Sequence, residues 1–384
     1  MVKRFVNLLC CMAVIFSGQL NAQGISKRID SLFNAVTNNS NMHFSGSVVV
    51  TEKGKIIYQN SKGYANIDKK ILNGPTTNFS LASLSKVFTA IAVMQLKEKG
   101  KLNLDDPLIK YLPEFPFRKI TIRQLLTHTS GLPDFEIFRN YIGAPVGKSL
   151  SYTDIIPTLK NTPGLLFAAG TQWHYSSVGF GLLALLVETV SQEPFSQYIE
   201  EKICKPAGLV NTYVDITGRR IDDRSKTIQY VNSRMVSGDI TSADTLKTNL
   251  DDPIQTIAGP GLIVSSVNDL LKFVEALNTD ELLSAATKEE MFKPAKLNNG
   301  EFVELEHAPL YNALGWGIDI DSSVGKIASH TGGSPGISTI LLINLSKQQV
   351  VIVLENTDNR APILFGINAM NILNNKPVMH FRED

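Results

Sequence analysis

The chain has 384 residues, of which 43% are hydrophobic, and a formal net charge of +1. This length and composition allow a large buried core, and we expect a single domain built from two interlocked subdomains. A nearly neutral chain offers no electrostatic basis for binding nucleic acid, because that affinity depends on basic side chains that contact phosphates. We therefore expect no nucleic-acid partner.

The first residues have the pattern of a secretory signal peptide. Lys3 and Arg4 precede an apolar run over residues 5–16, and small and polar residues follow up to Ala22. This pattern predicts a signal peptide over residues 1–22. The apolar run is shorter than the ~20 residues that span a bilayer, so we expect no stable membrane span after its removal. The mature chain would carry a charge of −1 and keep only Cys204, which leaves it without an internal disulfide.

A helix and a β-hairpin are predicted before a central helix. Apolar residues recur at helical spacing over residues 25–36. Residues 45–66 alternate in polarity and turn at residues 52–55, which predicts the hairpin. Residues 81–100, LASLSKVFTAIAVMQLKEKG, are apolar or small on almost every side near their middle and predict a helix buried within a larger body.

Ser83 and Lys86 lie at the start of this central helix. Helical residues three apart share one face, so their side chains can meet. A serine hydroxyl needs a base to accept its proton, and burial would favour the neutral amine that lets a lysine act as one. The first helical turn also offers free N–H groups to an oxyanion. We interpret Ser83 and Lys86 as nucleophile and base, although Ser-x-x-Lys arises about once or twice by chance in a chain of this length.

Two other serines match active-site patterns without their structural context. Ser323 begins a second Ser-x-x-Lys, but it lies between two alternating runs that predict a hairpin turn. Ser334 lies in a Gly-x-Ser-x-Gly pattern, but Pro335 has no N–H to donate and a strand pattern follows. We exclude both as nucleophiles. The scattered histidines and cysteine show no ligand spacing, so no metal or other cofactor is expected, and His128 is expected to brace its loop.

Residues 101–294 are predicted to be mainly helical, with long ordered loops. Helices are expected within residues 120–131, from Ser177 onward and from Ser265 onward, the last opened by a capping serine or asparagine. Residues 218–252 are polar and lack periodicity, which suggests a surface excursion or a lid over a cleft.

Strand patterns return after residue 310. Four β runs precede a closing helix over residues 363–373, and they are Gly315–Ile320, Lys326–His330, Ile337–Asn344 and Val350–Glu355. We expect strands from both ends of the chain to form one antiparallel sheet into which the helical middle is inserted, an α+β fold. The predicted sheet subdomain comprises residues 23–80 and 295–384, and the helical subdomain comprises residues 81–294.

Two further motifs fit the same chemistry. Tyr175, in the Tyr-Ser-Ser motif at 175–177, could accept the serine proton if a cation such as Lys86 favours its phenolate, although a core tyrosine ahead of a helix fits equally well. The His-Thr-Gly-Gly motif at 330–333 ends a predicted strand, where the N–H of Gly333 could be a second oxyanion donor. A plain glycine turn explains that motif equally well.

These three motifs, in this order and at these separations, resemble the signature motifs of the serine β-lactamase and D-alanyl-D-alanine peptidase superfamily, specifically its class C β-lactamase-related branch. The stretches LLTHTSGLPD (125–134) and GPGLIVSSVNDLLKF (259–273) are also similar to that branch. The resemblance covers residues 46–355. It implies a bacterial protein with a five-stranded antiparallel sheet flanked by helices, an all-α subdomain and an active site in the cleft between them.

The resemblance also implies a role for each matching residue. Ser83 would be the acylated nucleophile, Lys86 and Tyr175 its shared base, and the N–H groups of Ser83 and Gly333 the oxyanion hole. Ser177 would hydrogen-bond Lys86 and substrate, while His330 and Thr331 would line the substrate edge. Two positions differ from the β-lactamases of the family, which usually have asparagine where Ser177 stands and lysine where His330 stands. Histidine is similar to the residue that D-amino-acid peptidases and some esterases of the branch carry.

We therefore expect a periplasmic or secreted serine hydrolase that cleaves an amide or ester bond through an acyl-serine intermediate. The expected substrate is a D-amino-acid peptide or a small ester. One alternative is a β-lactamase. Another is a penicillin-recognising binding module without hydrolytic activity, which the intact Lys86, Tyr175 and Gly333 disfavour because a binder has no use for a complete proton relay.

Overall fold

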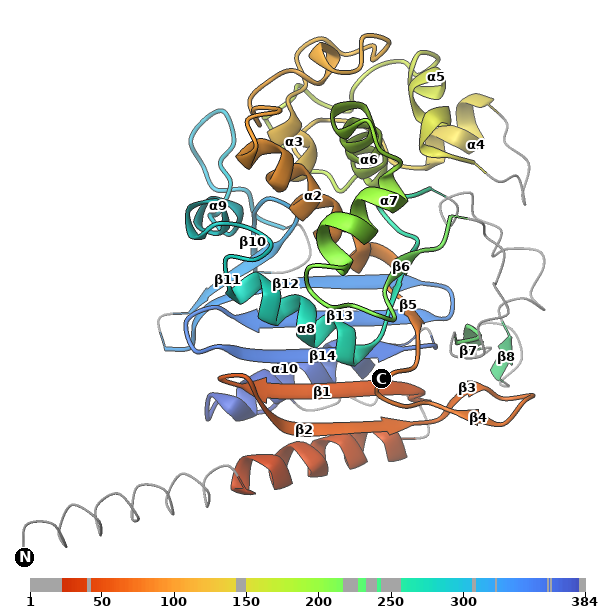
Figure 1. Ribbon diagram of the computed structural model, residues 1–384, viewed down its shortest axis with the longest axis vertical. Helices are drawn as coiled ribbons and strands as arrows, with labels where there is room; N and C mark the ends of the chain where they lie inside the picture. The colour runs from red at the N-terminus through yellow and green to blue at the C-terminus, as the bar shows by residue number, and fades with distance from the viewer. Residues whose placement is uncertain are drawn as a thin grey trace, which may run out of the picture.

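The computed structural model describes residues 23–39, 43–142, 150–216, 227–232, 240–242, 257–305, 309–321, 323–357, 359 and 361–379 (Figure 1). The predicted signal peptide lies outside these residues, as does most of the predicted lid over 218–252. The amphipathic helix predicted at the N-terminus is present over residues 23–38.

One antiparallel sheet is built from both ends of the chain, as predicted (Figure 1). Its strand order is β10-β11-β12-β13-β14-β1-β2, so the strand after the N-terminal helix lies beside the last strand of the chain. The strands are β1 (Gly46–Glu52), β2 (Lys55–Lys62), β10 (Tyr311–Asn312), β11 (Gly317–Asp321), β12 (Gly325–Ser334), β13 (Ile337–Asn344) and β14 (Gln349–Glu355).

The five strands implied by the family resemblance are therefore too few. All six β runs predicted from the sequence join the sheet, and the two-residue strand β10 adds a seventh at one edge. Two residues are too short for polarity to alternate visibly, so this strand carries no sequence signal. The mixed α and β architecture itself is confirmed.

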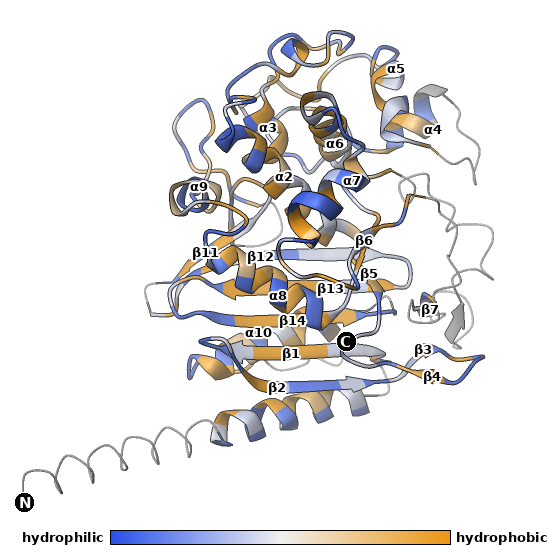
Figure 2. Cartoon of the chain, viewed as in Figure 1, coloured by the Kyte–Doolittle hydropathy of each residue, from blue (hydrophilic) through white to orange (hydrophobic). Residues whose placement is uncertain are grey.

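The sheet separates two hydrophobic cores. Side chains alternate across a strand, so Val48 and Val50 face one core while Val49 faces the other. The smaller core packs the N-terminal helix and α10 (Ala361–Leu373) against one face. The larger core joins the other face to the helical region. Figure 2 shows the central strands as largely hydrophobic, whereas the edge strand β2 is more polar and has a single buried residue.

The helical region is organised around α2 (Lys86–Glu98), in which every residue from Lys86 to Leu96 is buried. Contacts join α2 to α6 (Ser177–Ser191), the second predicted buried helix. The third predicted helix, α8 (Val267–Asn278), is capped by the Ser266 side chain, which accepts a hydrogen bond from the Asp269 N–H. The predicted helix before Gly131 is shorter than expected, since α3 (Ile122–Leu126) ends ahead of that glycine.

Short elements complete this region. They are η1 (Ala82–Ser85), η2 (Leu108–Lys110), α4 (Glu136–Ile142), η3 (Tyr152–Asp154), α5 (Ile155–Leu159), α7 (Phe195–Ile199), η4 (Glu200–Cys204) and α9 (Ala285–Met291). A small sheet that the sequence did not predict has the order β5-β9-β6, formed by Phe79–Ser80, Ile263–Ser265 and Tyr213–Val214. Two-stranded pairs join β3 (Tyr64–Asn66) to β4 (Ile71–Leu72) and β7 (Tyr230–Asn232) to β8 (Ile240–Ser242). Within the part of the chain that the structure describes, no helix has the length and apolar character needed to span a bilayer.

Candidate active site

Ser83 lies in the 3-10 turn η1, directly before α2. The sequence predicts a helix from this point, and the α-helical portion begins three residues later, at Lys86. Ala82 has φ +46°, a conformation that non-glycine residues rarely adopt and that persists only where neighbours hold it. Here the Leu81 N–H donates to Ile263 O at 2.9 Å, and Ser85 Oγ accepts from the Ile263 N–H at 3.1 Å. Strand β9 therefore fixes the turn that presents Ser83.

Lys86 reaches the candidate nucleophile from inside the protein. Its side chain is almost completely buried, with 1% of the residue exposed. Its Nζ donates to Ser83 Oγ at 3.2 Å, so the two side chains meet as predicted from their spacing. The same Nζ donates to the carbonyl oxygen of Pro260 at 3.2 Å and lies over the aromatic rings of Tyr175 and Phe180, at 4.8 and 5.7 Å from their centroids. Both aromatic faces attract a cation there.

The Tyr-Ser-Ser motif leads into α6 and places Tyr175 beside Lys86. Lys86 contacts the face of the tyrosine ring. Its hydrogen bonds go to Ser83 and Pro260 and not to the tyrosine hydroxyl. Ser176 caps α6, and its Oγ accepts from the Gly179 N–H at 3.3 Å and donates to Pro133 O at 2.9 Å.

Ser177 is buried at the start of α6 but does not hydrogen-bond Lys86, contrary to what the resemblance implies. Its backbone N–H donates instead to Asp134 Oδ1 at 2.8 Å, which anchors this end of the helix to the preceding loop. A contact between Ser177 and substrate remains an expectation.

Strand β12 forms the other side of the site, and Gly332 explains how closely it packs on the serine turn. A Cβ atom added at Gly332 would lie 2.1 Å from Leu81 O, so only glycine lets the strand approach the turn that carries Ser83. Thr339 Oγ1 donates to the same Leu81 oxygen at 3.1 Å. An added Cβ at Gly333 would meet nothing within 4 Å. The second glycine is exposed, and the oxyanion role of its N–H remains a prediction.

His330 lies on β12 and is uncharged at neutral pH. Burial, together with the positive charge of Lys86, lowers the pKa of its imidazole to about 4. Its Nδ1 lies 2.6 Å from Thr331 O. A carbonyl oxygen can only accept, so Nδ1 carries the proton and Nε2 remains a hydrogen-bond acceptor. Thr331 itself is exposed along this edge.

Two supports of the site were not singled out from the sequence. Pro260 contributes the carbonyl that accepts from Lys86, and the neighbouring Gly259 O accepts from Thr89 Oγ1 at 2.8 Å. Asp134 accepts from the Ser177 N–H; burial raises the pKa of its carboxyl, while the charge of Lys86 opposes that rise. Pro260 lies in the stretch 259–273 and Asp134 in the stretch 125–134. The similarity of these stretches to the family was the sequence signal that could have identified both residues.

The excluded serines lie where the sequence places them. Ser323 is in the turn between β11 and β12, and Ser334 ends β12 with strand β13 following at Ile337. His128 braces its loop as expected, since its Nδ1 accepts from the Ser176 N–H at 3.1 Å. Among the described residues, no group of three or more His, Cys, Asp or Glu side chains is placed to hold a metal ion.

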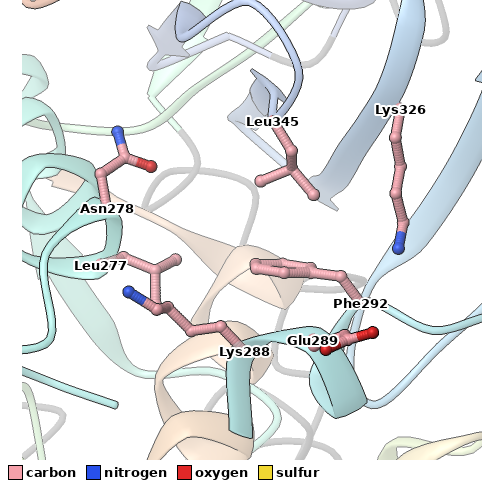
Figure 3. Close-up of a pocket in the computed structure, with 7 residues that line it drawn as sticks. All are labelled: Leu277, Asn278, Lys288, Glu289, Phe292, Lys326 and Leu345. Atoms are coloured by element: carbon pink, nitrogen blue, oxygen red, sulfur yellow. The ribbon is translucent and has the colours of Figure 1, made fainter. Parts of the chain in front are cut away.

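A separate pocket of about 300 Å³ lies between α8, α9 and the sheet (Figure 3). Its lining residues are Leu277, Asn278, Lys288, Glu289, Phe292, Lys326 and Leu345. None of them belongs to the serine, tyrosine or glycine motifs. The candidate active site is therefore the surface around Ser83 and not this pocket.

The antiparallel sheet, the helices packed on it and the clustered serine, lysine and tyrosine place the protein among serine hydrolases of the β-lactamase superfamily. Residues 36–368 match the family model described as Beta-lactamase, and the chain belongs to this family.

Individual relatives agree with this placement. Penicillin-binding protein 4* of Bacillus subtilis strain 168 is 34% identical over 344 residues, which cover 88% of this chain and 73% of the relative. The crystal structure of a penicillin-binding protein from Bacillus halodurans has a TM-score of 0.74 at 26% identity and covers 88% of this chain and 99% of that chain. An octameric penicillin-binding protein homologue from Pyrococcus abyssi shares the fold, with a TM-score of 0.77, 23% identity and coverage of 91% and 77%.

Proposed function

We propose that the protein is a periplasmic or secreted hydrolase that cleaves an amide or ester bond through an acyl-Ser83 intermediate. The observation that carries this proposal is the 3.2 Å contact between Lys86 Nζ and Ser83 Oγ in a buried setting against the ring of Tyr175. A nucleophile in reach of a shielded base is the arrangement that activates a serine.

The proposed reaction has two stages, the acylation of Ser83 and the hydrolysis of acyl-Ser83. Lys86 and Tyr175 act as a shared base in the form in which the pair lacks one proton, and in that form the pair accepts the Ser83 proton as Oγ bonds to the substrate carbonyl carbon. The N–H groups of Ser83 and Gly333 stabilise the resulting oxyanion. Collapse breaks the bond to the leaving group, which takes up the proton, and leaves acyl-Ser83. A water molecule then attacks the acyl carbon and gives a proton to the base, and the bond to Ser83 Oγ breaks as the base passes that proton to Oγ and the product acid leaves.

The proposed substrate is a D-amino-acid peptide or a small ester. At the substrate edge His330 presents a neutral imidazole with Nε2 as an acceptor, so this position supplies no fixed positive charge for a carboxylate. That feature disfavours substrates that carry a carboxylate, which include penicillins, cephalosporins and peptides ending in D-Ala-D-Ala, relative to neutral esters. The family placement keeps β-lactam hydrolysis as the second candidate.

Parallel measurements with p-nitrophenyl esters, D-Ala-D-Ala peptides and nitrocefin test the substrate class. Faster turnover of esters or D-Ala-D-Ala peptides supports the proposal, and faster turnover of nitrocefin moves β-lactam hydrolysis to first place. Stoichiometric labelling by penicillin with no turnover of any substrate would support the non-hydrolytic binding module.

A labelling experiment tests the nucleophile. Ser83→Ala should abolish labelling by a fluorophosphonate or penicillin probe, because no other described serine has a lysine amine in this arrangement. Ser323→Ala and Ser334→Ala are matched controls and should label normally. An adduct located on Ser334 by mass spectrometry would overturn the proposed mechanism.

A further inference from the structure

His128 occupies an unusual backbone position directly behind the candidate site. It follows α3 with φ +55°, a left-handed conformation that is rare for a residue other than glycine or asparagine. It is also buried, with 5% of its surface exposed. A strained conformation in a buried polar residue persists only when its contacts hold it there.

Those contacts converge on Tyr175 from three sides. The imidazole stacks on the tyrosine ring at 4.5 Å between centroids and 27° between planes. His128 O accepts the N–H of His174, the residue before Tyr175, at 2.9 Å. His128 Nδ1 accepts the N–H of Ser176, the residue after it, at 3.1 Å. One residue therefore holds the backbone on both sides of the tyrosine and the face of its ring.

The arrangement requires a neutral imidazole. A nitrogen that accepts an N–H carries no proton, so Nδ1 is bare and the proton is on Nε2. The charged or titratable groups around the ring come from several elements: Lys86 on α2, His330 on β12 and His174 ahead of α6 all oppose a positive charge on it. Burial, the largest cause, and these neighbours hold the pKa of His128 well below its usual value.

The His128 ring also packs against a residue that contacts Lys86. Phe180 lies 5.1 Å from the His128 ring and under the Lys86 ammonium, which also lies over Tyr175. A shift of the imidazole would therefore change the position of the tyrosine relative to Lys86. Misplacement by about 1 Å can cost a catalytic group on the order of 10²-fold in rate.

We propose that His128 is a positioning residue, whose neutral imidazole and backbone hold Tyr175 against Lys86 in the geometry that lets the tyrosine hydroxyl serve in proton transfer. This inference rests on the proposed function, because it assigns His128 a role through Tyr175. It goes beyond loop bracing, which would affect folding alone.

Two substitutions separate the contacts of the side chain. His128→Asn keeps an acceptor at the position of Nδ1, tolerates the left-handed backbone and removes the stacked ring. His128→Phe keeps a ring and leaves the buried Ser176 N–H without its partner. With an ester substrate and active sites titrated by a fluorophosphonate probe, we expect kcat per active site to fall roughly 10-fold for His128→Asn and roughly 100-fold for His128→Phe, with KM within about 3-fold. His174→Asn is the control and should keep kcat.

The decisive measurement repeats both substitutions in the Tyr175→Phe background. That variant keeps the stacked ring but has no hydroxyl left to position, so each His128 substitution should then cost less than about 3-fold. The inference would be overturned if a His128 substitution lowered kcat by the same factor in both backgrounds. It would also be overturned if the substitution lowered only the fraction of protein that the fluorophosphonate probe labels and left kcat per active site unchanged. If His128→Phe does not fold, His128→Asn carries the test. Activity that survives Ser83→Ala in the same assay would refute the proposed function. If the activity depends on Ser83 but the His128 and Tyr175 substitutions lower kcat independently of each other, only the inference about His128 is refuted.

Discussion

The two sides of the candidate site differ in how exposed they are. The helical side presents Ser83, Lys86 and Tyr175, which are fixed by contacts with β9, Pro260 and His128. The strand side is the end of β12, where Thr331 and Gly333 are exposed. Groups that move protons need precise placement, whereas a surface that selects substrates needs access to them. The difference suggests that chemistry depends on the helical side and substrate choice on the strand side.

Lys86 connects the two sides electrostatically. Its charge contributes to lowering the pKa of His330 on the strand side and of His128 on the helical side. The imidazoles on both sides of the site are therefore held uncharged next to the buried Lys86. Substitutions on each side should therefore produce distinguishable effects.

The largest effect is expected from the helical side. Lys86→Ala and Tyr175→Phe should each lower kcat/KM by roughly 10² to 10⁴, the usual range for general acid–base groups. The double variant should lose much less than the product, because the two residues act as one relay. Steady-state kinetics of the three variants tests this, with Lys326→Ala, the lysine of the second Ser-x-x-Lys, as a matched control. Strictly multiplicative losses would show that the relay does not exist.

The next effect concerns the contact between the two sides. Gly332→Ala should destabilise the fold by about 1–3 kcal/mol or more, since its Cβ would overlap the Leu81 carbonyl oxygen. Gly333→Ala has open space around its Cβ and should change the free energy of unfolding by no more than about 0.5 kcal/mol. Urea denaturation of both variants makes the comparison. Equal stabilities would mean that β12 does not approach the serine turn as closely as the structure shows.

A smaller effect is expected on the strand side, where His330→Lys should change substrate preference. A lysine ammonium could hold a substrate carboxylate by a charge-assisted hydrogen bond, which contributes about 1.5–3 kcal/mol where water is excluded and less where it is not. The charge of Lys86 works against a second cation, so we expect the lower part of this range.

The measurement is kcat/KM for a neutral p-nitrophenyl ester and for nitrocefin, in wild type and mutant, at two salt concentrations. Wild type should prefer the ester at pH 7.5, and the mutant should shift the ratio toward nitrocefin most strongly at low salt. His330→Gln removes the imidazole at the same position without adding a charge and is the control. If His330→Lys leaves the ratio of the two kcat/KM values unchanged at low salt, His330 does not select the substrate.

The smallest effect is a dependence of stability on pH. The imidazole of His330 has a pKa of about 4 in the folded protein and about 6.5 when unfolded, so between these values the unfolded chain binds more protons. Its contribution therefore lowers stability as the pH falls from about 6.5 toward 4. The urea midpoint of unfolding should decrease less from pH 7 to pH 5 for His330→Gln than for wild type. The same decrease in both proteins would show that the fold does not hold this histidine neutral.

Local patterns in the sequence determined much of the fold. Alternating polarity located the N-terminal hairpin, short β runs between turns located the four longer C-terminal strands, including β13 at its observed bounds, and helical patterns located the N-terminal helix, α6 and α8. These signals are local because the periods of a strand and a helix appear within a few residues. The order of the three motifs likewise identified the family, and the spacing of Ser83 and Lys86 predicted their contact.

Contacts between distant residues were decided only by the tertiary structure. Lys86 and Pro260 lie 174 positions apart, and no periodicity predicts that a carbonyl so distant accepts from this amine. The 3-10 turn at Ser83, held by β9, and the stacking of His128 on Tyr175 have the same origin. A motif specifies which groups are present, but their orientation follows from packing, because a strained turn or a buried imidazole is stable only where residues from elsewhere in the chain supply its partners.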